Sequence, residues 1–305
     1  MAIVYHYTTV STLLGMLSEC STKDPYITMW ATHASYLNDP TEYKYGKKVC
    51  LDTIKEIENE LNIPECKRFS KIYYNDDLNK SIELSDFLSS TCPSMQGGIP
   101  YIISLSRSND ALPMWNTYTK KGNGIAIGFD EDLLCKGCWE FGEKRQDTLP
   151  MLEEKYEIRE CIYDSSHKDF ISIRDSYKKE YLELLNAIST SNEIINNKVR
   201  AFAFLERFYK ALAPYTKNKA YEYEQEVRFL VKDKGELYFR ESNGTIIPYV
   251  KVKISLKCIK EIIIGPTMDA DRTKDSLTML LYRRGCIDIL SDPEKMIKTS
   301  IVPYR

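Results

Sequence analysis

The sequence predicts an α+β fold with a mixed or antiparallel central sheet. Strand-like alternation of apolar and polar residues occurs near both ends of the chain, while helical periodicity fills the part between them. The 305 residues include 43% hydrophobic and 28% charged side chains, which is the mixture of a globular protein that buries a sizeable core. We therefore interpret residues 1–305 as a single α/β domain built around one core.

The N-terminal part of the chain is predicted to run strand, helix, strand and helix. Alternation indicates strands at Val4–Thr8 and Tyr26–Thr32, and Val10–Leu17 between them has the pattern of a helix. The next helix begins near Asp39 and Pro40, because Asp39 can cap a helix and proline suits the first helical position. Its apolar face consists of residues at helical spacing: Tyr43, Cys50, Ile54, Ile57 and Leu61.

The remaining strands are marked by apolar runs and turn residues. They are predicted at Tyr101–Ser106, Ile125–Phe129, Ile158–Tyr163, Glu224–Val231, Leu237–Phe239, Ile246–Val252 and Ile259–Ile264. Between the third and fourth of these strands the periodicity becomes helical, which indicates a helical hairpin inserted over about residues 167–216. Met268–Leu281 is predicted to be a closing helix and Cys286–Leu290 a last short strand.

Composition limits the classes of partner. Lys and Arg number 42 against 44 Asp and Glu, so the net charge of −2 gives no overall attraction to nucleic acid or to an anionic membrane, although a local patch could still exist. The nine cysteines are odd in number and scattered, which is typical of reduced thiols in a cytoplasmic protein. No signal-peptide pattern opens the chain and no apolar run reaches the length of a membrane span. We therefore expect a cytoplasmic protein with no membrane contact.

The first segment that could carry chemistry is Tyr5-His6-Tyr7-Thr8. Alternation places His6 and Thr8 on one face of the strand, and Tyr5 and Tyr7 on the other. A histidine in this position could donate to a ribose hydroxyl or act as a base. It could equally be a core histidine that bonds to a backbone carbonyl.

A second segment, Ala34–Glu42, precedes a predicted helix. It could bring Tyr36 and Asn38 to a pocket, or it could serve only to cap the helix. Farther along, Trp115 and Tyr118 stand three residues apart and could form one aromatic wall, either of a binding site or of the core.

A third segment, Tyr223–Phe229, carries two carboxylates and a guanidinium in a strand pattern. Glu224, Glu226 and Arg228 are predicted to line one face of that strand. Such a row suits a site that stabilises a developing cation. A solvent-facing strand with cross-strand ion pairs would have the same pattern, so the structural interpretation stays open.

Several catalytic motifs are missing from the sequence. It has no P-loop, no G-x-G-x-x-G after a strand, no G-x-S-x-G and no H-E-x-x-H. With only three histidines in the chain, a multi-histidine metal centre is not expected.

Short motifs follow one another along the chain in a characteristic order. They are Tyr5-His6-Tyr7, Leu37–Glu42, Ser104–Ser106, Met114-Trp115 with Tyr118, Gly124–Phe129, Tyr223–Arg228 and Ile262–Gly265. This order resembles the domain of unknown function 2971 family over nearly the whole chain. The name of that family leaves its activity undefined.

A more distant resemblance is to ADP-ribosyltransferases of the His-Tyr-Glu type. These enzymes carry a histidine on the first strand, an aromatic residue that packs on nicotinamide, and a glutamate on a later strand, often within E-x-E. His6 in its Tyr-His-Tyr-Thr context is similar to the opening of the DNA-targeting toxins of that superfamily. The resemblance implies an ADP-ribosyltransferase-like fold, with Tyr36 as the aromatic residue and Glu226 as the catalytic one. Arg228 has no obvious counterpart in the triad.

The resemblance also implies a site that binds NAD as substrate. Glu226 would stabilise an oxocarbenium-like state and Glu224 would orient the nucleophile. Independently of the resemblance, we expect Arg228 to support the carboxylates, because two carboxylates on one strand face repel each other and need a nearby cation to stay ionised. NAD would be held by the residues around them: His6, Tyr7, Thr8, Tyr36, Asn38 and Trp115. We expect His6, Tyr36 and Glu226 to converge on one cleft, and Glu226→Gln to abolish activity with unchanged melting.

The implied function is NAD-dependent ADP-ribosyl transfer to a protein, DNA or RNA acceptor by a toxin or antiviral defence effector, with an antitoxin as a further partner. Two alternatives stay open. The chain could be a non-catalytic ligand-binding or regulatory protein with structural ion pairs, or a nuclease or other hydrolase whose carboxylates bind a divalent ion. Release of free nicotinamide from NAD would distinguish the first function from both alternatives.

Overall fold

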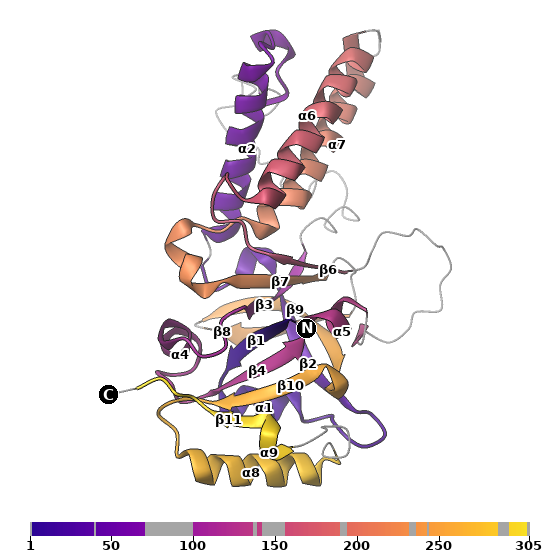
Figure 1. Ribbon diagram of the computed structural model, residues 1–305. Helices are drawn as coiled ribbons and strands as arrows, with labels where there is room; N and C mark the ends of the chain where they lie inside the picture. The colour runs from indigo at the N-terminus through magenta and orange to yellow at the C-terminus, as the bar shows by residue number, and fades with distance from the viewer. Residues whose placement is uncertain are drawn as a thin grey trace. The chain divides into compact units, whose positions relative to one another are not determined.

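The chain divides into two compact units, whose helices and strands are labelled in Figure 1. Unit 1 contains Met1–His33, Tyr101–Glu160 and Glu222–Arg305, and unit 2 contains Ala34–Pro100 and Cys161–Tyr221. The computed structural model describes residues 2–39, 41–70, 100–136, 139–141, 156–189, 194–231, 236–242, 244–285 and 293–303. The single domain stays a prediction, because compactness does not say whether the units fold separately.

Unit 1 is built mainly from strands. They are β1 (Ile3–Thr8), β2 (Tyr26–His33), β3 (Tyr101–Ser106), β4 (Ile125–Asp130), β5 (Trp139–Phe141), β6 (Tyr156–Glu160), β7 (Glu226–Val231), β8 (Leu237–Ser242), β9 (Thr245–Ser255), β10 (Ile259–Ile264) and β11 (Ile297–Thr299). The α-helices of this unit are α1 (Val10–Met16), α4 (Leu112–Tyr118), α5 (Glu131–Cys135), α8 (Ala270–Arg283) and α9 (Pro293–Met296). Side-chain caps set where several of them begin, as Thr9 does for α1 and Asp269 for α8.

The strands form one sheet of 11 strands. Its longest path runs β11-β10-β4-β1-β3-β2-β9-β5, while β7 joins β3 to β6, and β8 pairs with β9. Only β10 and β11 are parallel among the described strand pairs. The predicted α+β class with a mixed, mostly antiparallel sheet is therefore confirmed.

The sheet forks at β3. The start of β3, at Tyr101 and Ile102, pairs with β2, whereas its last residue, Ser106, pairs with Tyr5 of β1. Strand β7 pairs with β3 along its full length and therefore occupies the other edge. Two arms of the sheet leave the same edge of β3: the first arm through β1, β4 and β10, and the second arm through β2 and β9.

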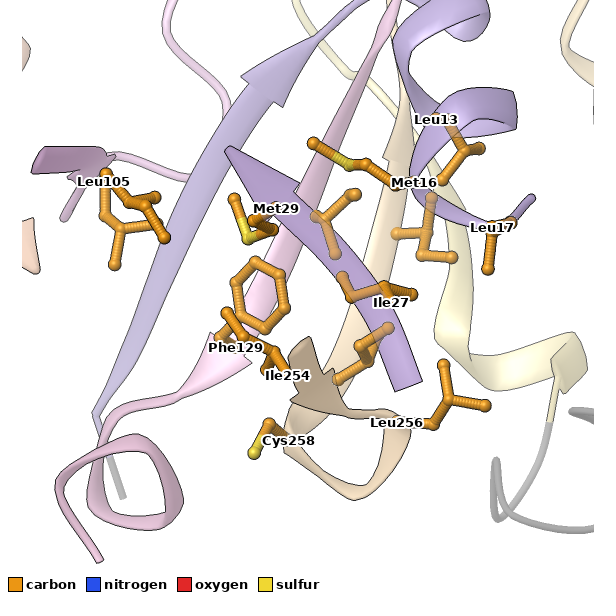
Figure 2. Close-up of a cluster of buried hydrophobic side chains, with 14 of the residues drawn as sticks. Leu13, Met16, Leu17, Ile27, Met29, Leu105, Phe129, Ile254, Leu256 and Cys258 are labelled. Carbon is orange, nitrogen blue, oxygen red and sulfur yellow. The ribbon is translucent and has the colours of Figure 1, made fainter. Parts of the chain in front are cut away.

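The main core lies on one side of both arms, which we call the inner face. Figure 2 shows Leu13, Met16 and Leu17 of α1 beside Ile27 and Met29 of β2. Further members come from all the central strands: Val4, Leu105, Ile127, Phe129, Val227, Phe229, Val250, Val252, Ile262 and Ile264. Each such side chain, when fully buried, stabilises the fold by about 1.5–3 kcal/mol relative to exposure.

The opposite side of the first arm, which we call the outer face, carries a smaller apolar cluster. Its buried members are Tyr5, Tyr7, Met114, Trp115, Ala126 and Ile263. The alternation predicted for β1 is therefore confirmed, since Val4 faces inward while Tyr5 and Tyr7 face outward.

Unit 2 is mainly helical. Its long helices are α2 (Glu42–Glu60), α6 (Lys168–Ser189) and α7 (Ile194–Leu212), and α7 contacts both of the others. The predicted helical hairpin is thus confirmed, and α2 packs against it. A fully buried carboxylate, Glu58, fixes the chain after α2, because it accepts hydrogen bonds from Ser70 N over 2.9 Å and from the hydroxyl of Tyr181 over 2.9 Å.

Most predicted elements agree with the structure to within a few residues. The strand predicted at Ile158–Tyr163 is found at Tyr156–Glu160, and Ile162 instead bridges Thr216 within unit 2. The strand predicted at Cys286–Leu290 lies outside the described residues. No helix in the described ranges has a stretch long and apolar enough to cross a membrane.

Candidate active site

A polar row crosses the outer face of unit 1. It consists of residues that stand opposite one another in successive strand pairs: Glu261 in β10, Gly128 in β4, Tyr5 in β1, Ser106 in β3 and Glu226 in β7. Directly opposed residues in a sheet point to the same side. The register therefore places all of them on the face that carries Tyr7 and Trp115.

Gly128 leaves room in this row for the ring of Tyr5. A Cβ atom on Gly128 would lie 2.9 Å from both Tyr5 Cε1 and Glu261 Cγ, which is closer than carbon atoms pack. Across this gap the hydroxyl of Tyr5 donates to Glu261 Oε1 over 2.7 Å, and Lys298 forms an ion pair with the same carboxylate. Burial and the Glu261 carboxylate together raise the pKa of Tyr5 above its usual value.

At the other end of the row, Glu226 and Arg228 form a buried salt bridge. Nε of Arg228 lies 3.0 Å from Oε1 of Glu226, and Nη2 lies 3.1 Å from Oε2. The side chain of Glu226 is 4% exposed and that of Arg228 is 2% exposed. Burial lowers the pKa of Arg228, and the two charge-assisted hydrogen bonds offset part of the lost hydration. The pair is thus a fixed carboxylate and guanidinium in a poorly hydrated place.

Glu224 reaches this region by a different backbone route from the one predicted. It ends a 3₁₀ helix, Lys219–Glu224, and β7 begins only at Glu226. Between them Gln225 has a φ of 42°, in the left-handed region that non-glycine residues seldom occupy. The prediction that Glu224, Glu226 and Arg228 line one face of a single strand is therefore wrong, because the chain turns at Gln225.

Glu224 is nevertheless held next to the polar row. Its backbone carbonyl accepts a hydrogen bond from Ser106 Oγ over 2.6 Å. The residue is 3% exposed, and its carboxylate accepts a hydrogen bond from the hydroxyl of Tyr118 over 3.1 Å. Glu224 thus contacts a phenol, and Glu226 contacts a guanidinium.

His6 lies on the inner face, away from Glu226. It stands between Tyr5 and Tyr7 in β1, and its partner in β4 is Ile127, a member of the main core. The prediction that His6 and Glu226 face one cleft is therefore wrong. The alternation within β1 was predicted correctly, but the face shared with Glu226 depends on the register of β1, β3 and β7, and that register selects Tyr5.

At the fork of the sheet, His6 has a structural contact instead. Its Nδ1 lies 3.1 Å from the carbonyl oxygen of Ser104, between the parts of β3 that pair with β2 and with β1. A carbonyl only accepts, so Nδ1 carries the proton. Burial lowers the pKa of His6, and the bond to Ser104 opposes that effect. These contacts match the core-histidine interpretation.

The other NAD-binding residues predicted in unit 1 are enclosed. Tyr7 donates to the carbonyl oxygen of Ser108 over 3.0 Å. Trp115 is 0% exposed, packs edge-on against Tyr7 with ring centroids 4.8 Å apart, and donates to Asp110 Oδ1 over 2.6 Å. Thr8 is buried and follows the inner-face alternation of β1. Tyr7 and Trp115 therefore belong to the buried apolar cluster of the outer face.

Tyr36 and Asn38 belong to unit 2. Tyr36 ends the 3₁₀ helix Ala34–Tyr36, and both side chains are exposed. The predicted convergence of Tyr36 with Glu226 of unit 1 on one cleft stays a prediction. Asp39 has a capping role, because its Oδ1 accepts from Thr41 N over 2.8 Å just before α2 begins. Thr41, and not Asp39, stands at the N-cap position.

Sequence reasoning missed some members of the polar row. Tyr5 and Ser106 lie in motifs that were already noted, but only strand register shows that they join Glu226. A signal did exist for Glu261, which is the one carboxylate within the apolar run Ile259–Ile264. Among the residues that the structure describes, no group of three or more His, Cys, Asp or Glu could hold a metal ion.

One family comparison bears on this site. Residues 114–229 match the family described as protein of unknown function, DUF2971. The predicted resemblance is therefore confirmed over this part of the chain. The DUF2971 segment contains Tyr118, Glu224, Glu226 and Arg228, whereas the motifs before residue 114 and after residue 229 lie outside it. No curated protein and no solved structure matches the chain.

Proposed function

We propose that the outer face around Glu224, Glu226 and Arg228 breaks the nicotinamide–ribose bond of NAD and transfers ADP-ribose. The observation that supports this most is the presence of two buried carboxylates with one residue between them, Glu224 bonded to a phenol and Glu226 to a guanidinium. Enzymes that break glycosidic bonds use carboxylates in distinct environments, one facing the positive charge and the other handling the proton.

In this reaction the bond between ribose C1′ and the nicotinamide nitrogen breaks, and its electron pair leaves with nicotinamide. Glu226, held in its salt bridge with Arg228, would face the positive charge that develops on the ribose. An acceptor hydroxyl then bonds to C1′, and its proton passes to Glu224. Tyr118 would hold the Glu224 carboxylate in position, and Arg228 would do the same for Glu226.

Other parts of this function rest on resemblance. They are an ADP-ribosyltransferase-like strand arrangement, packing of Tyr36 on nicotinamide, a role of Asn38 in the pocket, and a cytoplasmic location. A macromolecular acceptor and an antitoxin, as partners of a toxin or defence effector, belong to the same group. His6 is not included, because its side chain faces the inner core.

The salt bridge determines how this proposal can be tested. Glu226→Gln alone would leave Arg228 buried without that carboxylate, at a cost of about 3–5 kcal/mol. Unchanged melting is thus no longer expected for this variant, and a loss of activity could reflect unfolding. The double variant Glu226→Gln, Arg228→Met removes both charges and should recover most of the stability.

The experiment compares wild type, both single variants and the double variant. Nicotinamide released from NAD is measured by chromatography, and thermal unfolding is recorded in parallel. We expect the double variant to melt close to wild type and to release no nicotinamide. Asp24→Asn, which breaks an exposed pair with Lys253, is the control and should keep both properties. Wild-type release by the double variant would contradict the role of Glu226.

A non-catalytic function is the second candidate, because the Glu226–Arg228 pair is almost fully buried and internally bonded. In that case the wild type releases no nicotinamide, and the pair matters only for stability. Full recovery of melting in the double variant together with an inactive wild type would support this candidate.

A further inference from the structure

Aromatic rings stack on the exposed side of β2, β8 and β9, in the second arm of unit 1. Trp30 and Tyr249 have ring centroids 4.5 Å apart with an interplanar angle of 29°. Tyr249 and Tyr238 continue the stack at 5.7 Å and 28°. We call this surface the aromatic face, and it also includes the cations Arg240 and Lys251.

Strand register explains why these rings share one side. Tyr238 pairs directly with Tyr249, and Trp30 pairs with Lys251. Met29 and Ala31, on either side of Trp30, point into the main core. The indole of Trp30 therefore points away from the core, and it is 46% exposed. A tryptophan that is this exposed in the middle of a strand presents a large π surface to a ligand.

Two cations lie over these rings. The guanidinium carbon of Arg240 is 5.6 Å from the ring centroids of both Trp30 and Tyr249, and Nζ of Lys251 is 4.6 Å from that of Tyr238. Arg240 donates to Thr32 Oγ1 over 2.9 Å and forms no ion pair with a carboxylate among the described residues. Its charge is thus placed among rings with no anion to balance it there.

Two carboxylates contact members of this face. Glu19 is 3.7 Å from Lys251, and Glu236 accepts from the Tyr238 hydroxyl over 2.5 Å. The residues that flank Trp30 on the same side of β2 are Thr28 and Thr32, which are polar. Along β2, Trp30 therefore has no aliphatic neighbour on this side, whereas β9 contributes one, Ile247, which pairs with Arg240.

We propose that the aromatic face binds single-stranded nucleic acid. A base stacks on the exposed indole of Trp30, and the phosphates next to it pair with Arg240 and Lys251. Rings presented on a sheet beside cations suit this ligand, because every base has a π face and every linkage carries a negative charge. The near-neutral chain then binds through a local patch. This surface does not depend on the proposed NAD chemistry.

The test measures fluorescence anisotropy of a fluorescein-labelled single-stranded oligothymidylate of about 12 nucleotides, a length within the range that such surfaces cover. The full chain is titrated at two salt concentrations, and a duplex of the same length is titrated in parallel. Variants are Trp30→Leu, Trp30→Phe and Arg240→Gln. Phe239→Leu is the matched control, because Phe239 is exposed on the other side of β8.

Trp30→Leu is expected to weaken binding about tenfold or more, while Trp30→Phe keeps most of the affinity because it keeps a ring. Arg240→Gln is expected to reduce the slope of log affinity against log salt by about 0.7, as loss of one phosphate contact does. Phe239→Leu should bind as wild type does.

Several results would overturn the proposal: no binding by wild type, equal affinity for the duplex, or wild-type affinity in Trp30→Leu. Sedimentation equilibrium of wild type and Trp30→Leu provides a separate check. Self-association that disappears in Trp30→Leu would show that a second copy of the chain, and not nucleic acid, covers this face.

Discussion

Gly128 shows how one residue can determine a set of contacts on the outer face. The hydroxyl of Tyr5 reaches Glu261 only because β4 has no side chain between them. Glycine is needed here because it has no side chain, and not because of an unusual backbone conformation, since Gly128 has the ordinary backbone of a strand residue in β4.

Gly128→Ala is therefore expected to lower the free energy of unfolding by about 1–3 kcal/mol, because the added methyl group would overlap Cε1 of Tyr5 and Cγ of Glu261. Chemical denaturation followed by circular dichroism measures this change. Gly15→Ala is the matched control: no atom lies within 4 Å of the new Cβ, and the helical position should gain up to about 1 kcal/mol. Equal stability of Gly128→Ala and wild type would show that Tyr5 and Glu261 are not held in this way.

Arg228 supports a second residue-scale prediction, which depends on the proposed function. Its guanidinium holds both oxygens of Glu226, a geometry that the single ammonium of lysine cannot reproduce. Arg228→Lys is expected to slow nicotinamide release by about 10- to 100-fold through misplacement of Glu226. The dissociation constant for NAD should hardly change.

Single-turnover kinetics and NAD titration separate these two quantities for Arg228→Lys. A large rise in the dissociation constant with an intact single-turnover rate would instead assign Arg228 to binding of the NAD pyrophosphate.

At the scale of an element, β7 depends on the residue just before it. The left-handed Gln225 ends the 3₁₀ helix and sets the alternation of the strand, so that Val227 and Phe229 face the core while Glu226 and Arg228 face outward. The carbonyl of Gln225 also accepts a hydrogen bond from Arg107 N over 2.9 Å, which ties the turn to the end of β3.

Substitutions at Gln225 should therefore follow backbone preference. Gln225→Val is expected to lower the free energy of unfolding by about 1–2 kcal/mol, because a β-branched residue tolerates a left-handed φ poorly. Gln225→Gly should stay within about 1 kcal/mol of wild type, since relief of strain and greater freedom of the unfolded chain oppose each other. Denaturant titration gives both values. A valine variant as stable as the glycine variant would contradict the strain at this turn.

The same turn explains where sequence reasoning stopped at this scale. Alternation and apolar runs located β1, β3, β4, β7 and β10 to within about two residues, because each of these strands is largely buried. It could not show that the period breaks at Gln225, since neither the residue nor its neighbours are typical of a left-handed turn. Glu224 was consequently assigned to the strand.

For the molecule as a whole, two enclosed histidines make stability depend on pH. Burial lowers the pKa of His33 to about 4 from an ordinary value of 6.5, and it also lowers the pKa of His6. Between these values the unfolded chain takes up protons that the folded chain does not. Stability is therefore fully present above about pH 6.5 and is lost as the pH falls towards 4.

Urea midpoints at pH 7 and pH 5 measure this loss. The double variant His6→Gln, His33→Gln should lose less stability on acidification than wild type does, because glutamine binds no proton and still offers an N–H to Ser104. His167→Gln removes a histidine from unit 2 and serves as the control. An equal loss in wild type and the double variant would assign the acid sensitivity to carboxylates instead.

Long-range pairing is also what limited prediction at this scale. The sequence contains the strands and the alternation that puts His6 and Tyr5 on opposite faces, but no local pattern records that Tyr5, Ser106 and Glu226 are opposite one another. The fork at β3 has the same origin, because it depends on which strands share one edge. Candidate site residues could therefore be selected by type, and their grouping could not.

The polar row also fixes an order of events during synthesis. Tyr5 and Glu261 are 256 positions apart. At about 5–20 residues per second, a ribosome adds Glu261 roughly 10–50 s after Tyr5. During that interval β3 and β4, the two neighbours of β1, are completed, whereas β4 still lacks β10 on its other edge, and this edge is open to other nascent chains. The open edge of β4 should then be a preferred binding site for chaperones on the emerging polypeptide, and a chain released before β10 is made would keep that edge unpaired.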